Sequence, residues 1–95
     1  MQIQHQQHAD HGEFFLLSKT GEKLAELNYF FETPNRINAN HTFVSETLRG
    51  QGVAEQLYQA LSQFVRDNQL ELNPTCSYIA KKWERDQNHA KKDRT

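Results

Sequence analysis

The residues best suited to chemistry form a short glycine-containing segment, Arg49-Gly50-Gln51-Gly52-Val53-Ala54. Glycine lets a ligand approach the backbone closely, and a strongly patterned helix follows this segment directly. Unsatisfied backbone N–H groups and the positive end of the helix dipole therefore gather at this point. Such a turn suits an anionic group, above all a phosphate. The sequence predicts an anion-binding turn over residues 49–54.

The spacing of the glycines excludes two common nucleotide-binding motifs. The dinucleotide fingerprint G-x-G-x-x-G needs a third glycine at the position where this chain has Glu55. The phosphate loop of nucleotide hydrolases, G-x-x-x-x-G-K-[ST], does not occur in the sequence. The pattern that remains is R-x-x-G-x-A, formed by Arg49, Gly52 and Ala54.

Two further side chains suit group transfer, and each has a structural alternative. Cys76 lies at the expected start of a helix, after Pro74. There the dipole can lower the pKa of the thiol, although cysteine is more often a small buried hydrophobic residue. His41 lies on an expected strand. Its imidazole can act as a base near neutral pH, or it can simply pack half-buried with its hydrogen bonds satisfied.

Three histidines near the N-terminus raise the question of a metal site. His5, His8 and His11 are three residues apart. On a strand this spacing places neighbouring side chains on opposite faces, and no acidic or cysteine cluster completes a ligand set. We expect no metal site.

The elements that position these residues are strands in the first half of the chain. Aromatic and aliphatic runs predict strands over 13–18 and 23–32, joined as a hairpin, although Leu24, Leu27 and Phe31 would also suit one face of a helix. A further strand is expected over 36–44, where apolar and polar residues alternate strictly. One face of this strand is expected to carry Ile37, Ala39, His41 and Phe43, and the other Asn38, Asn40, Thr42 and Val44.

Helices follow in the second half. Apolar residues at spacings of three, four and seven predict a helix from Val53 to about 67–69, the best specified element of the chain. A short strand over 70–73 and a second helix from Ser77 to about Asn88 come next, with Thr75 or Ser77 as the N-cap. We expect one α/β (α+β) domain over 1–95, in which 1–12 is an edge strand or a loose arm and 91–95 a frayed tail.

Composition and charge limit the partners. The 95 residues carry 11 Lys and Arg against 12 Asp and Glu, a net charge of -1, which is not the overall footprint of a nucleic-acid binder. No apolar run approaches the roughly 20 residues that span a bilayer, so no membrane role is expected. The single cysteine cannot form an intramolecular disulfide, and the N-terminus lacks a signal-peptide pattern. We therefore expect a cytoplasmic location.

Three separated motifs resemble a known family. The pattern R-x-x-G-x-A, between a strand and a helix, is similar to the pyrophosphate-binding turn of the Gcn5-related N-acetyltransferases. The runs H-T-F-V at 41–44, L-R-G-Q-G-V-A at 48–54 and P-T-C at 74–76 resemble the very small, single-domain members of that superfamily, the N-acetyltransferase domain-containing protein 1-like group. The resemblance implies a minimal acyltransferase fold, in which a mostly antiparallel, mixed sheet carries two main helices.

The resemblance also implies an activity and a site. The chain would bind acetyl-CoA and move the acyl group from coenzyme A to an amine. The coenzyme would lie over 49–54, with its pyrophosphate on the backbone donors of this turn and Arg49 near a phosphate. The residues implied in coenzyme binding are Phe43, Val44, Ser45, Arg49, Gly50, Gln51, Gly52, Val53 and Ala54, the first three lining the pantetheine arm. Those implied in catalysis are Cys76, His41 and Tyr78, and Tyr78 would either protonate the departing thiolate or pack in the core.

Several alternatives stay open. The acceptor is expected to be an unidentified amine of a small molecule or a protein, and two other possibilities for the acceptor side are a second subunit that completes the pocket and no acceptor at all. The chain is expected to be a monomer or a weak homodimer. Direct transfer is preferred to an acyl relay through Cys76, because the sequence shows no partner base for the thiol. The main alternative is a non-catalytic acyl-CoA-binding or sensing module, and the last is a scaffold in which the glycine turn only packs the helix. Lys81, Lys82, Lys91 and Lys92 form a solvated face or contact the 3′-phosphate of the coenzyme.

Overall fold

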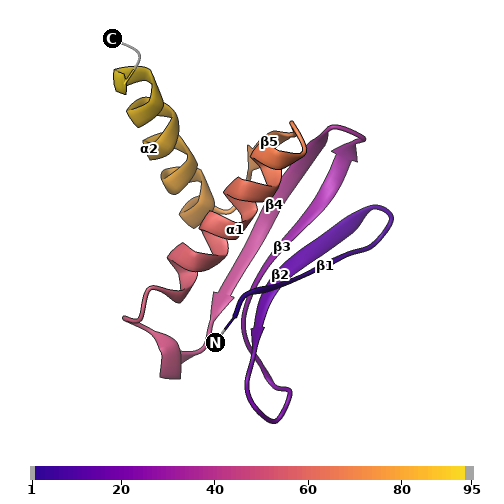
Figure 1. The fold of residues 1–95 in the computed structure, drawn as a ribbon, viewed down its shortest axis with the longest axis vertical. Helices are drawn as coiled ribbons and strands as arrows, with labels where there is room; N and C mark the ends of the chain where they lie inside the picture. Colours follow the sequence, from indigo (N-terminus) through magenta and orange to yellow (C-terminus); the bar gives the residue numbers. More distant parts are fainter. Residues whose placement is uncertain (1, 94–95) are drawn as a thin grey trace.

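The fold is a five-stranded sheet with two helices (Figure 1). A computed structural model describes residues 2–93, and the side chains of 2–87. The elements are β1 (Gln4–Gln7), β2 (His11–Leu17), β3 (Lys23–Thr33), β4 (Arg36–Val44), η1 (Glu46–Leu48), α1 (Val53–Asp67), β5 (Glu71–Pro74) and α2 (Ser77–Asp93). Strands β1 to β4 pair antiparallel in chain order, and β5 pairs parallel with β4. The predicted mixed, mostly antiparallel sheet is confirmed.

The predicted boundaries hold where hydrophobic periodicity is strong. Strand β4 has the bounds that the alternation predicts, and α1 starts at Val53. The N-terminal segment adopts the first of its two alternatives, because β1 forms the edge of the sheet. Helix α2 continues past Asn88 to Asp93, so 91–93 are helical rather than frayed. Residues 94–95 lie outside the described part of the chain.

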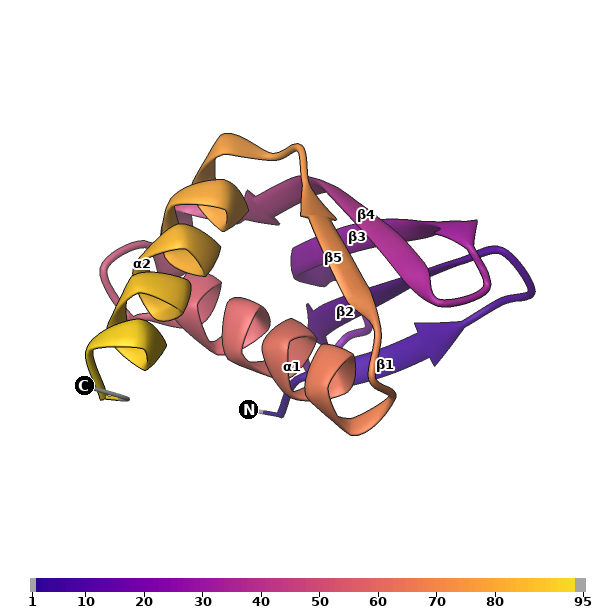
Figure 2. The same ribbon diagram turned by 90° about the horizontal axis from the view of Figure 1, so that it is seen from above.

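The core lies between the sheet and α1, which crosses one face of the sheet (Figure 2). Leu57 and Leu61 on α1 pack with Leu27 and Ile37 of the sheet, and all four are fully buried. Burial of each such side chain contributes on the order of 2 kcal/mol. Ile79 brings the first turn of α2 into the same cluster. The hydrophobic faces of both helices therefore fix their positions over the strands that carry the candidate site.

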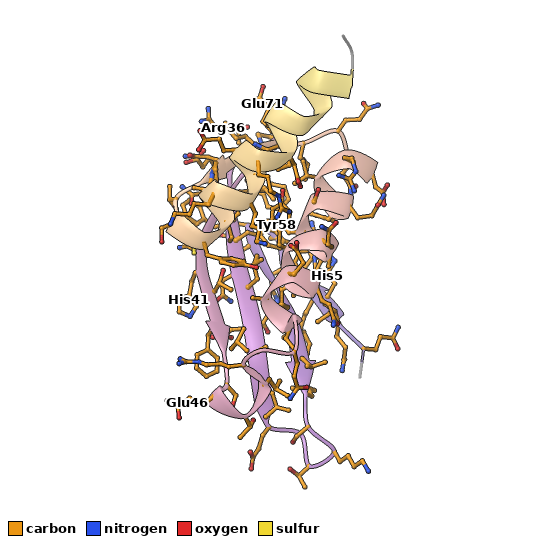
Figure 3. All side chains as sticks on the ribbon, turned by 90° about the vertical axis from the view of Figure 1, so that its left-hand side faces the viewer. His5, Arg36, His41, Glu46, Tyr58 and Glu71 are labelled. Atoms are coloured by element: carbon orange, nitrogen blue, oxygen red, sulfur yellow. The ribbon has the colours of Figure 1, made fainter. Side chains whose placement is uncertain are left out.

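A buried hydroxyl ties the two helices together. Tyr58 of α1 is fully buried, and its hydroxyl donates to Oδ2 of Asp86 on α2 at 2.6 Å. Burial and, next, the neighbouring carboxylate raise the pKa of Tyr58, so that the phenol keeps its proton. Figure 3 shows Tyr58 between the two helices. This contact joins α1 to α2 across the interior of the protein.

A β-bulge in β4 overturns part of the predicted alternation. Asn28 of β3 pairs with His41, but the next residue, Tyr29, pairs with Ala39, so Asn40 is an extra residue in β4. The extra residue reverses the alternation. Ala39 is fully buried towards α1, whereas His41 is exposed on the other face. The prediction that Ile37, Ala39, His41 and Phe43 share one face is therefore wrong beyond Ala39.

Candidate functional site

A cavity of about 340 Å³ opens at the N-terminus of α1. It is a cleft bordered by the end of β4, the turn before α1, the first turn of α1 and one side of α2. The lining residues are Val44, Leu48, Arg49, Gly50, Gly52, Val53, Ala54, Glu55, Tyr78 and Lys82. The fold thus brings the glycine turn and one face of α2 to a single site.

The backbone of the turn leaves the start of α1 open. Gly50 and Gly52 have φ of +84° and +75°, in the left-handed region that glycine adopts most readily. Gly52 is the N-cap of α1 and provides no side-chain cap. No heavy atom lies within 4 Å of the point where a Cβ would stand on either glycine. The first N–H groups of α1 therefore lack a capping side chain at Gly52, and an anion in the cavity can accept from them.

Charged side chains from both helices meet beside this turn. Oε1 of Glu55 lies 3.3 Å from Nζ of Lys82 and 3.3 Å from Nη2 of Arg85. Lys82 and Arg49 line the cavity and carry positive charge. The cavity therefore combines an open helix N-terminus with two cations, an arrangement that favours an anionic ligand.

Cys76 lies at the start of α2 and is itself the N-cap. Helix α2 begins at Ser77, and the carbonyl of Cys76 accepts from the N–H of Ala80 at 2.9 Å. The prediction of Thr75 or Ser77 as the N-cap is therefore wrong by one residue. The hydroxyl of Thr75 instead donates to Oδ1 of Asn38 at 2.6 Å.

The environment of Cys76 favours its thiolate. Partial burial alone would raise the pKa of the thiol, but hydrogen bonds from the Thr42 hydroxyl and from the backbone N–H groups of Ile79 and Tyr78 outweigh it and lower the pKa. The Thr42 hydroxyl lies 3.5 Å from the sulfur. A cysteine at a helix N-terminus with such donors is more reactive than a free cysteine near neutral pH.

Substitution of Thr42 tests this account of the thiol. In Thr42→Val the sulfur loses a hydrogen-bond donor, so the pKa of Cys76 is expected to rise and the pH of half-maximal alkylation by iodoacetamide to move upward with it. Only the thiolate reacts, so the alkylation rate as a function of pH reports the pKa directly. Thr20→Val, the same change in an exposed turn, is the control. Identical profiles for Thr42→Val and wild type would show that Thr42 does not stabilise the thiolate.

The other two predicted catalytic residues lie at different places. Tyr78 lines the cavity, and partial burial raises the pKa of its phenol, so that the hydroxyl carries a proton to donate at neutral pH. His41 lies on the face of β4 away from α1 (Figure 3), with its side chain 54% exposed and Nε2 3.7 Å from Oε1 of Glu26. The structure therefore brings Tyr78 to the glycine turn and leaves His41 on the outer face of the sheet.

The three residues predicted to line the pantetheine arm, Phe43, Val44 and Ser45, do not lie together in the structure. Val44 lines the cavity. Phe43 points to the opposite face and is 46% exposed, because the bulge at Asn40 has reversed the alternation. The Ser45 side chain accepts from the N–H of Thr47 as the N-cap of η1, and the Gln51 side chain donates to the carbonyl oxygen of Thr47 at 3.2 Å.

Three cavity residues lie outside the predicted coenzyme-binding set: Leu48, Glu55 and Lys82. Of these, Lys82 was expected on a solvated face or at the 3′-phosphate. In the sequence, Glu55 was noted only because it stands where the dinucleotide fingerprint G-x-G-x-x-G needs its third glycine. Lys82 and Tyr78 are four residues apart on α2, and Nζ of Lys82 lies 5.6 Å from the centre of the Tyr78 ring. This i, i+4 spacing is the sequence signal that places Lys82 on the same helix face as Tyr78.

Of the N-terminal histidines, His5 packs between the edge strand β1 and its neighbours in the sheet. The ring of His5 stacks on Phe14 at 4.1 Å, and its Nε2 lies 2.7 Å from the hydroxyl of Tyr29. Burial lowers the pKa of His5 and raises that of Tyr29 to about 12, so burial favours the neutral form of both groups at this contact. Within the described residues no group of three or more His, Cys, Asp or Glu is arranged to hold a metal ion. None of the described helices is long and apolar enough to cross a membrane.

Sequence comparisons relate most of the chain to acetyltransferases. Residues 13–92 match the model of the family described as GCN5-related N-acetyl-transferase. Protein NATD1 of Xenopus tropicalis is 35% identical over 57 residues, which are 60% of this chain and 52% of that protein. The alignment therefore spans about half of the length of this curated relative.

Solved structures show the same fold. An NMR structure from Staphylococcus aureus, described as GCN5-like, has a TM-score of 0.68 at 31% identity and covers 92% of this chain and 83% of that chain. Ribosomal-protein-alanine N-acetyltransferase from Brucella melitensis has a TM-score of 0.62 at 16% identity, covering 83% and 64%. AAC(6')-Iy, solved in complex with the bisubstrate analog CoA-S-monomethyl-acetylneamine, has a TM-score of 0.58 at 16% identity, covering 82% and 60%. The likeness at 16% identity is one of fold.

Proposed function

The chain belongs to the GCN5-related N-acetyltransferase family, and on this premise we propose that it binds acetyl-CoA at the N-terminus of α1 and transfers the acetyl group to an amine. One observation carries this proposal. The 340 Å³ cavity joins the open N-terminus of α1 and the glycine turn to two cations and to the protonated hydroxyl of Tyr78. A phosphate-bearing ligand whose reaction ends in a thiolate would use each of these features.

The residues present fit the coenzyme. Backbone N–H groups at the first turn of α1 would donate to the pyrophosphate, because no side chain of the N-cap competes for them. Gly50 and Gly52 leave the approach to the backbone free of Cβ atoms. Arg49 and Lys82 would neutralise part of the negative charge. Bound here, acetyl-CoA would supply an activated acetyl thioester.

The parting of β4 and β5 suits the pantetheine arm. The two strands pair only from Arg36 with Glu71 to Ala39 with Pro74. Beyond Ala39 the chain of β5 turns away into α2, while β4 continues to Val44 and has no β5 partner there. The amides of the arm can pair with this free edge as an additional strand would. An arm that runs along this edge from Val44 towards Ala39 would bring the thioester near Cys76, whose sulfur lies 3.5 Å from the Thr42 hydroxyl of β4.

Three side chains from different places can take part in the transfer: Tyr78 in the cavity, Cys76 at the start of α2 and His41 on the outer face of β4. Tyr78 donates its proton to the departing coenzyme thiolate. His41, on the solvent-facing side of β4, removes a proton from the attacking amine, directly or through water. We propose direct transfer to the amine. The lowered pKa of Cys76 favours one alternative, an acyl relay in which the sulfur first takes the acetyl group.

Substitutions of His41 and Cys76 test the reaction separately from binding. His41→Gln is expected to lower kcat about 10²-fold while the Kd for acetyl-CoA stays unchanged, because this side chain handles a proton and lies outside the cavity. Release of the coenzyme thiol would be followed with polyamines and lysine peptides as acceptors, and Kd by calorimetry. The control is His8→Gln, which changes an exposed histidine on the edge of the sheet.

Cys76→Ala distinguishes the two routes. A relay requires an acetylated protein that is visible by intact mass in wild type and absent from Cys76→Ala, together with complete loss of turnover in the variant. Direct transfer leaves measurable turnover in Cys76→Ala and no acetylated protein. Tight binding of acetyl-CoA without turnover on any acceptor would contradict both routes and indicate a non-catalytic acyl-CoA-binding module.

A further inference from the structure

Lys82 occupies an unusual place for a surface lysine. Although it belongs to α2, it lines the same cavity as Gly52 and Ala54 of the glycine turn. Its side chain is only 24% exposed, and its Nζ lies over the ring of Tyr78. The neighbouring Lys81 is exposed and does not line the cavity. Contacts with Glu55 and Tyr78 thus hold Lys82 at the lining of the cavity, where Lys81 does not lie.

The partner of Lys82 is a carboxylate with incomplete pairing. Oε1 of Glu55 accepts from both Lys82 and Arg85, each at 3.3 Å. Its second oxygen, Oε2, is buried and has no hydrogen-bond partner among the described residues. Both cations therefore share one oxygen, and Glu55 retains Arg85 as a counter-ion when Lys82 moves away.

This geometry points to an exchange of ion pairs. We propose that Lys82 binds the pyrophosphate of the coenzyme, leaving Glu55 for a phosphate oxygen, while Arg85 continues to neutralise Glu55. The inference rests on the proposed coenzyme site. The pyrophosphate is favoured over the 3′-phosphate, because Lys82 faces the cavity that also contains the N-terminus of α1, where a phosphate accepts from backbone N–H groups.

The physical chemistry favours the exchange. A charge-assisted hydrogen bond to a phosphate replaces a 3.3 Å contact that Lys82 shares with Arg85. The flexible stem of lysine lets the ammonium group move between neighbouring anions. Arg85 is 53% exposed and does not line the cavity, so it is suited to stay with Glu55.

A matched pair of lysine variants tests the proposal. Lys82→Gln is expected to weaken the calorimetric Kd for coenzyme A roughly tenfold, and Lys81→Gln to leave it unchanged. Both variants lose one positive charge from adjacent positions of the same helix, so a general electrostatic effect would move both. Equal Kd values for the two variants would overturn the proposal. Thermal melts without ligand check that each variant is folded.

Glu55→Gln provides the opposite test. Without the carboxylate, Lys82 no longer has to leave an anion, so the Kd for coenzyme A is expected to become several-fold tighter. This gain should disappear in the double variant Glu55→Gln, Lys82→Gln, because the two residues act through one ion pair. A gain of equal size in the presence and absence of Lys82 would contradict the exchange.

Dephospho-coenzyme A, which lacks the 3′-phosphate, identifies the group that is bound. The ratio of Kd values between Lys82→Gln and wild type should be the same for this probe as for coenzyme A. A ratio that falls to one would overturn the assignment to the pyrophosphate. Wild-type protein that binds neither coenzyme A nor dephospho-coenzyme A would contradict the proposed function. Binding that is the same in wild type and Lys82→Gln would contradict only the role of Lys82.

Discussion

Gly52→Val is expected to weaken the binding of acetyl-CoA at least tenfold. Gly52 is the N-cap of α1 with φ of +75°, a conformation in which a β-branched residue is strained by roughly 1–3 kcal/mol. If the backbone keeps this conformation, the valine side chain enters the cavity that Gly52 lines. If the turn relaxes, the N–H groups of the first turn move away from the pyrophosphate. Either response removes the proposed contact, and calorimetric titration measures the loss.

Gly21→Val is the matched control for this prediction. Gly21 lies in the turn between β2 and β3 with φ of +90°, and, as at Gly52, no heavy atom lies within 4 Å of the point where a Cβ would stand. The substitution therefore imposes a similar backbone strain away from the cavity. We expect a lower Tm but an unchanged Kd for acetyl-CoA. Equal losses of affinity in the two variants would mean that strain, rather than the position of Gly52, determines binding.

Gly12→Ala is expected to destabilise the fold by about 3 kcal/mol. Gly12 is buried in β2 opposite Tyr29 of β3, and the tyrosine ring lies over it. A Cβ at this position would lie 2.9 Å from the carbonyl oxygen of Gln6 and against the Tyr29 hydroxyl. Because Tyr29 is 2% exposed and its hydroxyl is hydrogen-bonded to His5, its ring has little room to move. Thermal unfolding should show a Tm lower by on the order of 15 °C.

A second substitution shows whether the tyrosine causes this loss. Tyr29→Leu removes the ring from above Gly12 and is destabilising by itself, because it empties part of the core. In the double variant Gly12→Ala, Tyr29→Leu, the alanine should lower the free energy of unfolding by less than it does in wild type. The losses of the two single variants should therefore not add. Strict additivity would contradict the proposed clash between Gly12 and Tyr29.

The arrangement of elements could be predicted because the patterns are local. The period of two in 36–44 and the helical spacing after Val53 set the bounds of β4 and the start of α1. The bulge at Asn40 could not be predicted, because the sequence continues to alternate through it while the pairing with β3 does not. That single extra residue decides which face of β4 His41 and Phe43 occupy.

The residues alone indicate the candidate site only over the contiguous turn, and the family resemblance adds Val44 and Tyr78, which line the same cavity. The turn from Arg49 to Ala54 carries its own signal in the glycines and the helix that follows. Lys82 and Glu55 meet through the packing of α2 on α1, a contact between distant segments that neither segment encodes alone. Cys76 was not predicted as an N-cap because Ser, Thr, Asp and Asn usually fill that position. The contact between its sulfur and the Thr42 hydroxyl joins segments that are distant in the sequence, so it could not be predicted from either segment alone.

The central claim, that the start of α1 binds the coenzyme, is tested most directly by a backbone amide NMR titration with acetyl-CoA. We expect the amide signals of Gln51, Gly52, Val53 and Ala54 to shift together and to saturate, while that of Gly21, which does not line the cavity, stays in place. At ligand concentrations about 100 times Kd, binding should also add about 2.7 kcal/mol to the free energy of unfolding. If no amide from 51 to 54 responds at millimolar acetyl-CoA, the proposed site is contradicted.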